Sequence, residues 1–80
     1  MRFDVALHAL RLVKSRSQGA AAIQDGIATL NGAATKPSHE VRAGDRITLA
    51  TALGGRTVEV LELPTGSLSR EAAKAFVREI

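Results

Sequence analysis

The stretch RLVKSRSQGAAAIQDG, residues 11–26, decides the first half of the fold. Ser15 is a favoured helix N-cap residue and Gly26 a favoured residue just beyond a helix C-terminus, so we predict a helix between the two. Lys14 and Arg16 lie beside the start of this helix, where cations are unfavourable by ~0.3 kcal/mol or more. A bound phosphate would reverse that effect, because backbone amides, a hydroxyl and both cations could contact it. The alternative is that solvent screens a weak repulsion and nothing binds.

The residues before and inside this helix indicate a pair of closely packed helices. Asp4 is a candidate N-cap for an earlier helix over about residues 5–12. At 100° per residue, Asp4, His8 and Arg11 fall on one solvent-exposed stripe of that helix. Gly19 costs ~1 kcal/mol relative to Ala inside a helix, so we expect it to permit close approach of a neighbouring backbone.

After the second helix the pattern changes to that of short β-strands separated by turns. Asn31-Gly32 is the dipeptide most typical of a two-residue hairpin turn. In the last expected strand, apolar and polar residues first alternate, and then the apolar residues move to the opposite parity. We therefore expect a bulge or the end of the strand near Leu61. Ser69 is a candidate cap for a terminal helix that extends to Ile80. The expected strands cover about residues 27–30, 33–36, 46–49 and 56–63, with further turns at 43–45 and 54–55.

These elements define the expected fold class, which is α+β: two N-terminal helices pack on a small curled antiparallel sheet, and a C-terminal helix follows. The length of 80 residues suits one domain with a small core. No apolar run approaches the ~18 residues of a membrane span, and the N-terminus does not look like a signal peptide. We therefore expect a cytoplasmic protein.

The distribution of charge points to the kind of partner. The net charge of +3 comes from 11 Lys and Arg against 8 Asp and Glu. All of the excess lies in residues 1–46, which hold seven cations and four acids, whereas residues 47–80 hold four of each. A basic zone of this kind favours a polyanion, and a solvated basic face is the alternative. With two Phe and no Trp or Tyr, the chain cannot offer many aromatic platforms to single-stranded bases.

Catalytic and metal-binding patterns are absent from the sequence. His8 and His39 are its two histidines, and neither belongs to a metal-binding spacing or a Ser-His-acid order. Glu59 and Glu62 lie three residues apart in an expected strand, so they face opposite sides of the sheet. Without cysteine, neither a disulfide nor a thiolate metal site can form. We expect no enzyme activity, no metal and no cofactor.

Taken in order, several short motifs resemble the RNA-binding S4 domain. They are RFD at residues 2–4, RLVKSRS at 11–17, Gly26, Asn31-Gly32, KPS at 36–38 and VRAGD at 41–45. The resemblance covers about residues 1–50, and the ordered series is far more specific than any single motif. It implies an S4 RNA-binding domain over residues 1–63, followed by a C-terminal helical extension over residues 64–80.

The end of the chain is similar to that of small stand-alone bacterial S4 proteins. Residues 57–63 and 69–73, with an aromatic at position 76, carry this similarity. Two kinds fit, namely ribosome-quality-control factors of the RqcP type and small heat-shock RNA-binding proteins; the short length favours the RqcP type. The resemblance implies a non-catalytic protein that contacts 23S ribosomal RNA and tRNA or peptidyl-tRNA on stalled large ribosomal subunits. It also implies support for a quality-control tailing factor, and neither a membrane nor DNA as a partner.

The same resemblance assigns the candidate RNA-binding residues. At some positions this sequence departs from the family pattern, and these departures reduce the surface expected to contact RNA. Residues 19–22 and 27–29 lack the basic residues that many relatives carry there, and His8 stands where an aromatic is frequent in the heat-shock type. The footprint is therefore expected to centre on residues 11–18. The matching RNA-facing positions are Arg2, Arg11, Lys14, Ser15, Arg16 and Gln18, with Asn31 and Lys36 as secondary contacts.

Other classes of protein remain as alternatives. A DNA-binding helix-turn-helix is disfavoured, because the second helix has Gly and Ala where a recognition helix needs long polar side chains. The remaining alternatives are a general S4-type ribosomal-RNA-binding or ribosome-assembly protein, a domain from an RNA-modifying enzyme, and a protein-interaction module with an incidental basic face. The salt dependence of RNA binding distinguishes the last of these from the rest.

Overall fold

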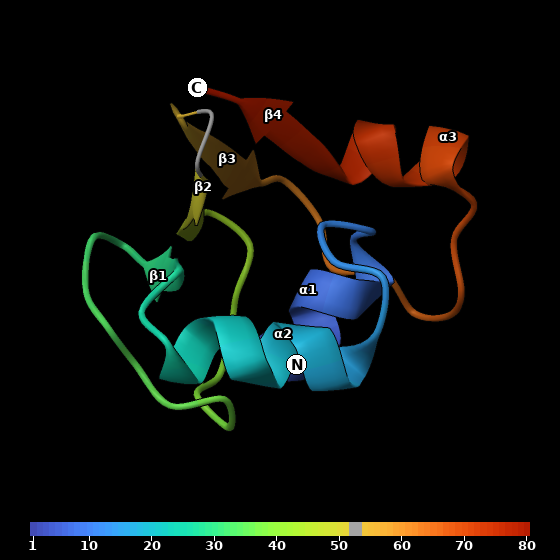
Figure 1. Cartoon of the computed structure of the whole chain (residues 1–80). Coiled ribbons are helices and arrows are strands. Elements are labelled where there is room, and N and C mark those ends of the chain that lie inside the picture. Colours follow the sequence, from blue (N-terminus) through green and yellow to red (C-terminus); the bar gives the residue numbers. More distant parts are fainter. Residues whose placement is uncertain (52–53) are drawn as a thin grey trace.

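The computed structural model describes residues 1–51 and 54–80 and has the expected α+β architecture (Figure 1). Two helices precede a four-stranded antiparallel sheet with strand order β1-β2-β3-β4. A short helix and a 3-10 turn lie between the last two strands. The elements are α1 (Phe3–Ala9), α2 (Arg16–Gln24), β1 (Ala28–Leu30), β2 (Arg46–Thr51), β3 (Gly54–Val60), α3 (Arg70–Ala73), η1 (Lys74–Phe76) and β4 (Val77–Glu79).

The start and end of α2 are those expected from the sequence. The Ser15 hydroxyl oxygen accepts a hydrogen bond from the Gln18 backbone N–H at 3.1 Å. The Gln18 side-chain carbonyl in turn accepts one from the Lys14 backbone N–H, also at 3.1 Å. Beyond the helix, Gly26 adopts a positive φ of 76°, a conformation that most side chains disfavour. Local capping therefore determines both ends of this helix.

Close packing of α2 on α1 depends on Gly19, as expected. A Cβ atom at this position would lie 3.0 Å from the Asp4 backbone oxygen and 3.4 Å from the Leu7 Cβ. The two helices can therefore approach to nearly backbone contact. This approach brings the first turn of α2 beside the first turn of α1.

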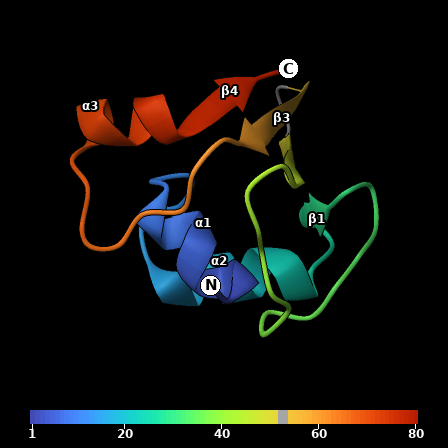
Figure 2. The same cartoon turned by 180° about the vertical axis from the view of Figure 1, so that it is seen from behind.

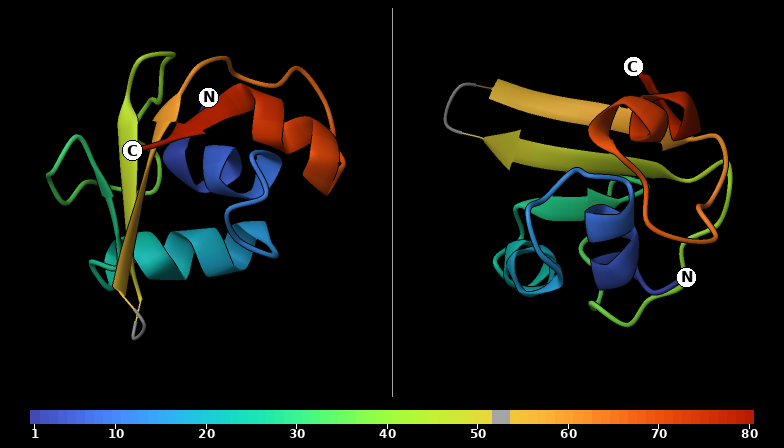
Figure 3. Two further views of the ribbon diagram at one scale, coloured as in Figure 1. Left: turned by 90° about the horizontal axis from the view of Figure 1, so that it is seen from above. Right: turned by 90° about the vertical axis from the view of Figure 1, so that its right-hand side faces the viewer.

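The core is aliphatic apart from one aromatic ring, and it lies between the helix pair and one face of the sheet (Figure 3). Phe3 and Leu7 of α1 are fully buried against the inward-facing side chains of β2 and β3. The β2–β3 pair extends beyond this core, away from α3 (Figure 3). The largest fully buried side chains are those of Phe3, Leu7, Val41, Ile47, Val58 and Val60.

The prediction for the first helix was wrong at both ends, since the helix ends at Ala9 and not near residue 12, and in the exposure of Asp4. The helix begins at Phe3, and its N-cap residue Arg2 makes no side-chain capping bond. Asp4 lies within the first turn and is only 3% exposed, so it neither caps the helix nor faces solvent. The cause is long-range pairing. The Phe3 N–H donates to the His39 carbonyl at 2.8 Å, and the Arg2 backbone bridges to that of Glu40 (Figure 2).

The Asn31-Gly32 turn and the end of β3 agree with the sequence prediction. Asn31 and Gly32 both adopt positive φ, 51° and 80°, as a tight hairpin turn requires. After it, the expected strand over residues 33–36 is reduced to a single bridge at Ala33.

β3 ends at Val60, immediately before the residues at which the apolar pattern changes parity. Gly54 and Gly55 belong to β3, so the turn predicted at these two residues was wrong.

The terminal helix is shorter than predicted. Ser69 caps α3 as expected, accepting a hydrogen bond from the Ala72 N–H at 3.1 Å. The helix then tightens into η1, and the chain from Val77 pairs with β3, with Val60 opposite Val77. A helical reading of these last residues was wrong because the open edge of β3 offers backbone partners that local pattern does not reveal.

Candidate nucleic-acid interface

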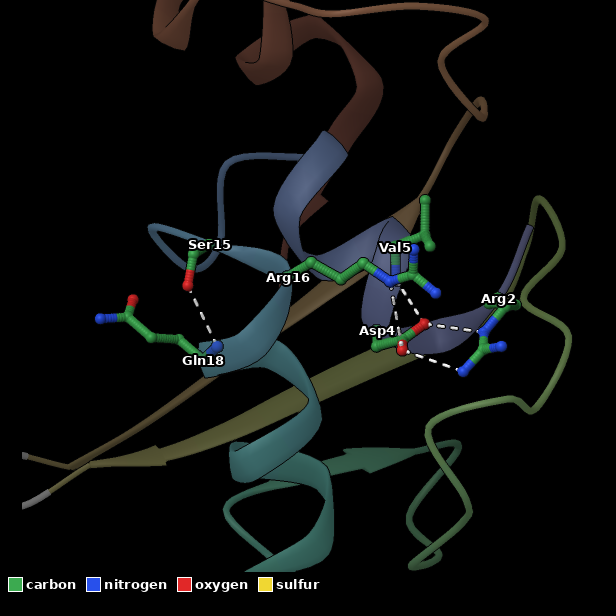
Figure 4. Close-up of polar contacts among 6 residues, drawn as sticks. All are labelled: Arg2, Asp4, Val5, Ser15, Arg16 and Gln18. Atoms are coloured by element: carbon green, nitrogen blue, oxygen red, sulfur yellow. Dashed lines mark hydrogen bonds and ion pairs between the residues drawn. The ribbon is translucent and has the colours of Figure 1, made fainter.

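A buried carboxylate holds two arginines at the junction of α1 and α2. Arg2 donates from Nε and Nη2 to the two carboxylate oxygens of Asp4, both at 3.1 Å. Arg16 Nε lies 3.6 Å from Asp4 Oδ2. Figure 4 shows the two arginines approaching Asp4 from opposite sides. The Asp4 side chain is 5% exposed, whereas those of Arg2 and Arg16 are 49% and 57% exposed. Both guanidinium groups are thus anchored at one edge and open to solvent at the other.

Asp4 is ionised at neutral pH in spite of its burial. Burial raises the pKa of the Asp4 carboxyl, but hydrogen bonds from the Arg2 side chain and the Val5 backbone N–H lower it. The charges of Arg2 and Arg16 lower it further, and the net result is a pKa below the ordinary value. The carboxylate therefore stays charged and orients both cations.

This arrangement explains part of the unusual charge at the start of α2. Arg16 follows the N-cap, and the Asp4 carboxylate, which was predicted to face solvent, compensates its charge. Lys14 makes no ion pair with any residue in the described ranges 1–51 and 54–80. Sequence reasoning missed the role of Asp4 because the contact depends on the packing of two helices at Gly19.

The predicted site residues do not all face the same surface. The backbone next to Lys36 lies against the start of α1, because the carbonyl of its neighbour Pro37 accepts a hydrogen bond from the Asp4 backbone N–H at 3.1 Å. Ser15 and Gln18 lie at the same helix start, where Ser15 Oγ and Gln18 Oε1 accept capping hydrogen bonds. We name the surface formed by Arg2, Lys14, Ser15, Arg16, Gln18 and Lys36 the hairpin surface.

Asn31 lies in the turn that follows β1, away from the start of α2. Its side-chain oxygen accepts from the Arg46 N–H at 2.9 Å, and its side-chain nitrogen donates to Asp45 at 3.2 Å. Both ends of the amide therefore stabilise the turn between β1 and the residues that follow. The hydrogen bonds of the Asn31 side chain therefore give this residue a structural role in the turn.

Arg11 faces the C-terminal part of the chain. It has a positive φ of 59°, and its Nε donates to the Leu68 carbonyl at 2.7 Å. Arg11 and Lys14 line a hollow of about 490 Å³ together with Arg70 at the start of α3. Arg70 was not among the predicted site residues, since nothing in the local sequence places it beside the α1–α2 connection.

No helix among the described residues is long and apolar enough to cross a membrane. No group of three metal-binding side chains occurs within residues 1–51 and 54–80. The features that remain are the basic surfaces.

A helix pair on a curled antiparallel sheet, with cations beside the capped start of the second helix, is the architecture of the S4 class of RNA-binding domains. Residues 1–47 match the S4 domain, and the chain belongs to this family. The chain is similar to the RQC P-site tRNA stabilizing factor of Helicobacter pylori strain J99, with 38% identity over 65 residues that cover 81% of this chain and 77% of the relative. A relative of the same name from Bacillus subtilis strain 168 is 33% identical over 76 residues, 95% of this chain and 88% of the relative.

The fold is also similar to that of a solved structure. Heat shock protein 15 of Vibrio cholerae, determined as a trimer, superposes with a TM-score of 0.93 at 29% identity. The superposition covers 100% of this chain and 81% of that protein. Both resemblances inferred from the sequence motifs are therefore confirmed.

Proposed function

We propose that this protein binds ribosomal RNA and tRNA on stalled large ribosomal subunits, as a non-catalytic component of ribosome-associated quality control. The observation that carries the proposal is the hairpin surface, where Asp4 holds Arg2 and Arg16 in position beside the capped start of α2. The names of the Helicobacter and Bacillus relatives support tRNA as one ligand. The proposal further includes that the protein contacts 23S ribosomal RNA, supports a tailing factor and is located in the cytoplasm.

The chemistry of the hairpin surface suits phosphates. Arg2 and Arg16 flank a carboxylate that is itself buried, so a phosphate approaching from solvent meets mainly positively charged groups. An arginine guanidinium can donate two parallel hydrogen bonds to a pair of phosphate oxygens. Because Asp4 already holds one edge of each guanidinium group, less side-chain conformational entropy is lost on binding. The cations of the hairpin surface are Arg2, Lys14, Arg16 and Lys36.

Recognition on this surface depends on RNA shape more than on base sequence. Phosphate contacts position a protein but carry no direct sequence information. The two Phe side chains are buried or half-buried, so neither offers an open stacking platform. Selection then comes from two RNA surfaces that meet, such as a ribosomal RNA helix beside a tRNA, within reach of a body measuring 27 × 24 × 22 Å.

Co-sedimentation with purified ribosomal particles tests the proposal. At about 0.15 M salt, we expect the protein to bind large subunits that carry peptidyl-tRNA in preference to empty large subunits and to small subunits. Arg16→Gln should weaken this binding. Arg78→Gln is the matched control, because Arg78 is equally exposed but lies on β4 and pairs with Glu59 at 2.5 Å. Equal binding to all particles would contradict the quality-control role and favour a general RNA-binding function.

A further inference from the structure

A second basic surface lies where the α1–α2 connection meets the C-terminal part of the chain. It is a groove of about 240 Å³ between Leu10 and Arg11 on one side and α3 and β4 on the other. Leu10 and Ala73, both almost fully buried, contribute its apolar floor. Four cations line it and no acid does: they are Arg11, Arg56, Arg70 and Lys74.

The geometry of the sheet explains how β3 contributes to this groove. Side chains alternate between the two faces of a strand, so Arg56 shares the inward face with the buried Val58 and Val60. Register pairs Val58 with Glu79, which places Glu79 on that face too. Arg78, one residue earlier, points to the opposite face and pairs there with Glu59.

The groove keeps an excess of positive charge after its ion pairs are counted. Arg56 Nε lies 2.5 Å from Glu79 Oε1, and Lys74 Nζ lies 3.2 Å from Glu71 Oε1. Within residues 1–51 and 54–80, neither Arg11 nor Arg70 pairs with an acid. The hydrogen bond from Arg11 Nε to the Leu68 carbonyl orients its guanidinium and leaves its terminal nitrogens available.

The groove is continuous with the hairpin surface. Arg11 and Arg70 line this groove and also the neighbouring hollow that contains Lys14. Lys14 in turn lies next to the start of α2, so the two hollows and the hairpin surface share neighbouring cations. Residues 47–80 are neutral as a whole, and only folding gives this part of the chain a positive surface.

We propose that the groove is a second binding site for the sugar-phosphate backbone of RNA, with Arg70 as its principal contact. The site extends the hairpin surface, so that one domain holds two neighbouring stretches of RNA backbone. The proposal depends on the proposed function for the identity of the ligand as RNA. It assigns residues 64–80 a part in binding, in addition to their pairing with β3.

The test compares single charge removals on the two surfaces. Arg70 is exposed, and its side chain makes no hydrogen bond or ion pair with any described residue, so Arg70→Gln should leave the fold intact. Binding of a purified structured RNA, a tRNA or a large-subunit rRNA fragment, is measured as a function of salt. Losing one phosphate contact should weaken binding by roughly tenfold at low salt and reduce the slope of log K against log [salt] by about 0.7–0.9.

The control variants separate failure of this proposal from failure of the proposed function. Arg78→Gln removes the same charge from the opposite face of the sheet and should leave the slope unchanged. If Arg16→Gln weakens binding and Arg70→Gln does not, the second site is overturned and the hairpin surface stands. If neither variant changes RNA binding, both proposals are overturned. If Arg70→Gln binds RNA normally but loses an acidic protein partner on the ribosome, the groove is a protein-docking site and the RNA proposal is wrong.

Discussion

Asp4 Oδ2 lies 3.6 Å from Arg16 Nε across the contact between α1 and α2, and the same carboxylate accepts two hydrogen bonds from Arg2. An acid in the first turn of one helix therefore compensates a cation at the start of the next. The contact links stability to function, because the same three charges that join the helices also form the centre of the hairpin surface.

Replacing Asp4 tests the structural side of this link. We expect Asp4→Asn to lower the free energy of unfolding by ~1–3 kcal/mol, because it removes the negative charge shared by two guanidinium groups and replaces one acceptor oxygen by an NH2 donor at a buried position. The lower part of this range is expected, since both arginines are about half exposed. Urea unfolding measures the change. Asp25→Asn is the matched control: Asp25 is exposed at the end of α2, and its removal should be neutral or slightly favourable. Equal effects of the two substitutions would contradict the assignment.

The pH dependence of stability should carry the signature of Asp4. Its pKa is lower in the folded state than the ordinary value of 3.8, so the folded protein binds a proton less readily than the unfolded chain. The contribution of Asp4 is thus fully present above about pH 5 and is lost as the pH falls below 3.8 through the lowered pKa. Unfolding free energies of the parent and of Asp4→Asn should converge as the pH falls. A constant difference would mean that the effect is not electrostatic.

Lys14 and Arg16 should differ in their effect on stability, although both flank the start of α2. Lys14→Gln removes a cation that has no acid partner in the described part of the chain, and we expect a gain of ~0.3–1 kcal/mol at low salt. Arg16→Gln also loses its contact with Asp4, so its net effect should be close to zero or a small loss. Thermal melts at low and high salt measure both. A gain of the same size from both variants would indicate that Arg16 is not held by Asp4.

Gly19 should tolerate no side chain. A methyl group at this position would lie 3.0 Å from a backbone oxygen of α1, which cannot rotate away as a flexible side chain can. The helix-propensity gain of ~1 kcal/mol from Gly19→Ala is therefore outweighed by overpacking of ~1–3 kcal/mol. We expect net destabilisation and weaker RNA binding, since separating the helices moves Arg16 from Asp4. Gly66→Ala, at an open loop position, is the control and should be neutral. A stabilised Gly19→Ala protein would show that the helices can separate without cost.

The sequence by itself determined the elements that depend on neighbours along the chain. Ser15 and Gly26 define α2, Asn31-Gly32 defines a turn, and the parity change near Leu61 marks the end of β3. These features follow from capping bonds and backbone conformations that involve residues only a few positions apart. The motif series was likewise sufficient to identify the S4 family over the first part of the chain.

Only the tertiary structure decided which charges meet. Asp4 is buried because the N-terminal residues pair with the segment around Glu40, and the terminal helix ends early because β3 offers an open edge. Arg70 and Arg11 line one groove although 59 positions separate them in an 80-residue sequence. The physical reason is the same in each case: these contacts join residues far apart in sequence, and their free energy depends on burial and pairing that arise only once the helices and the sheet have come together.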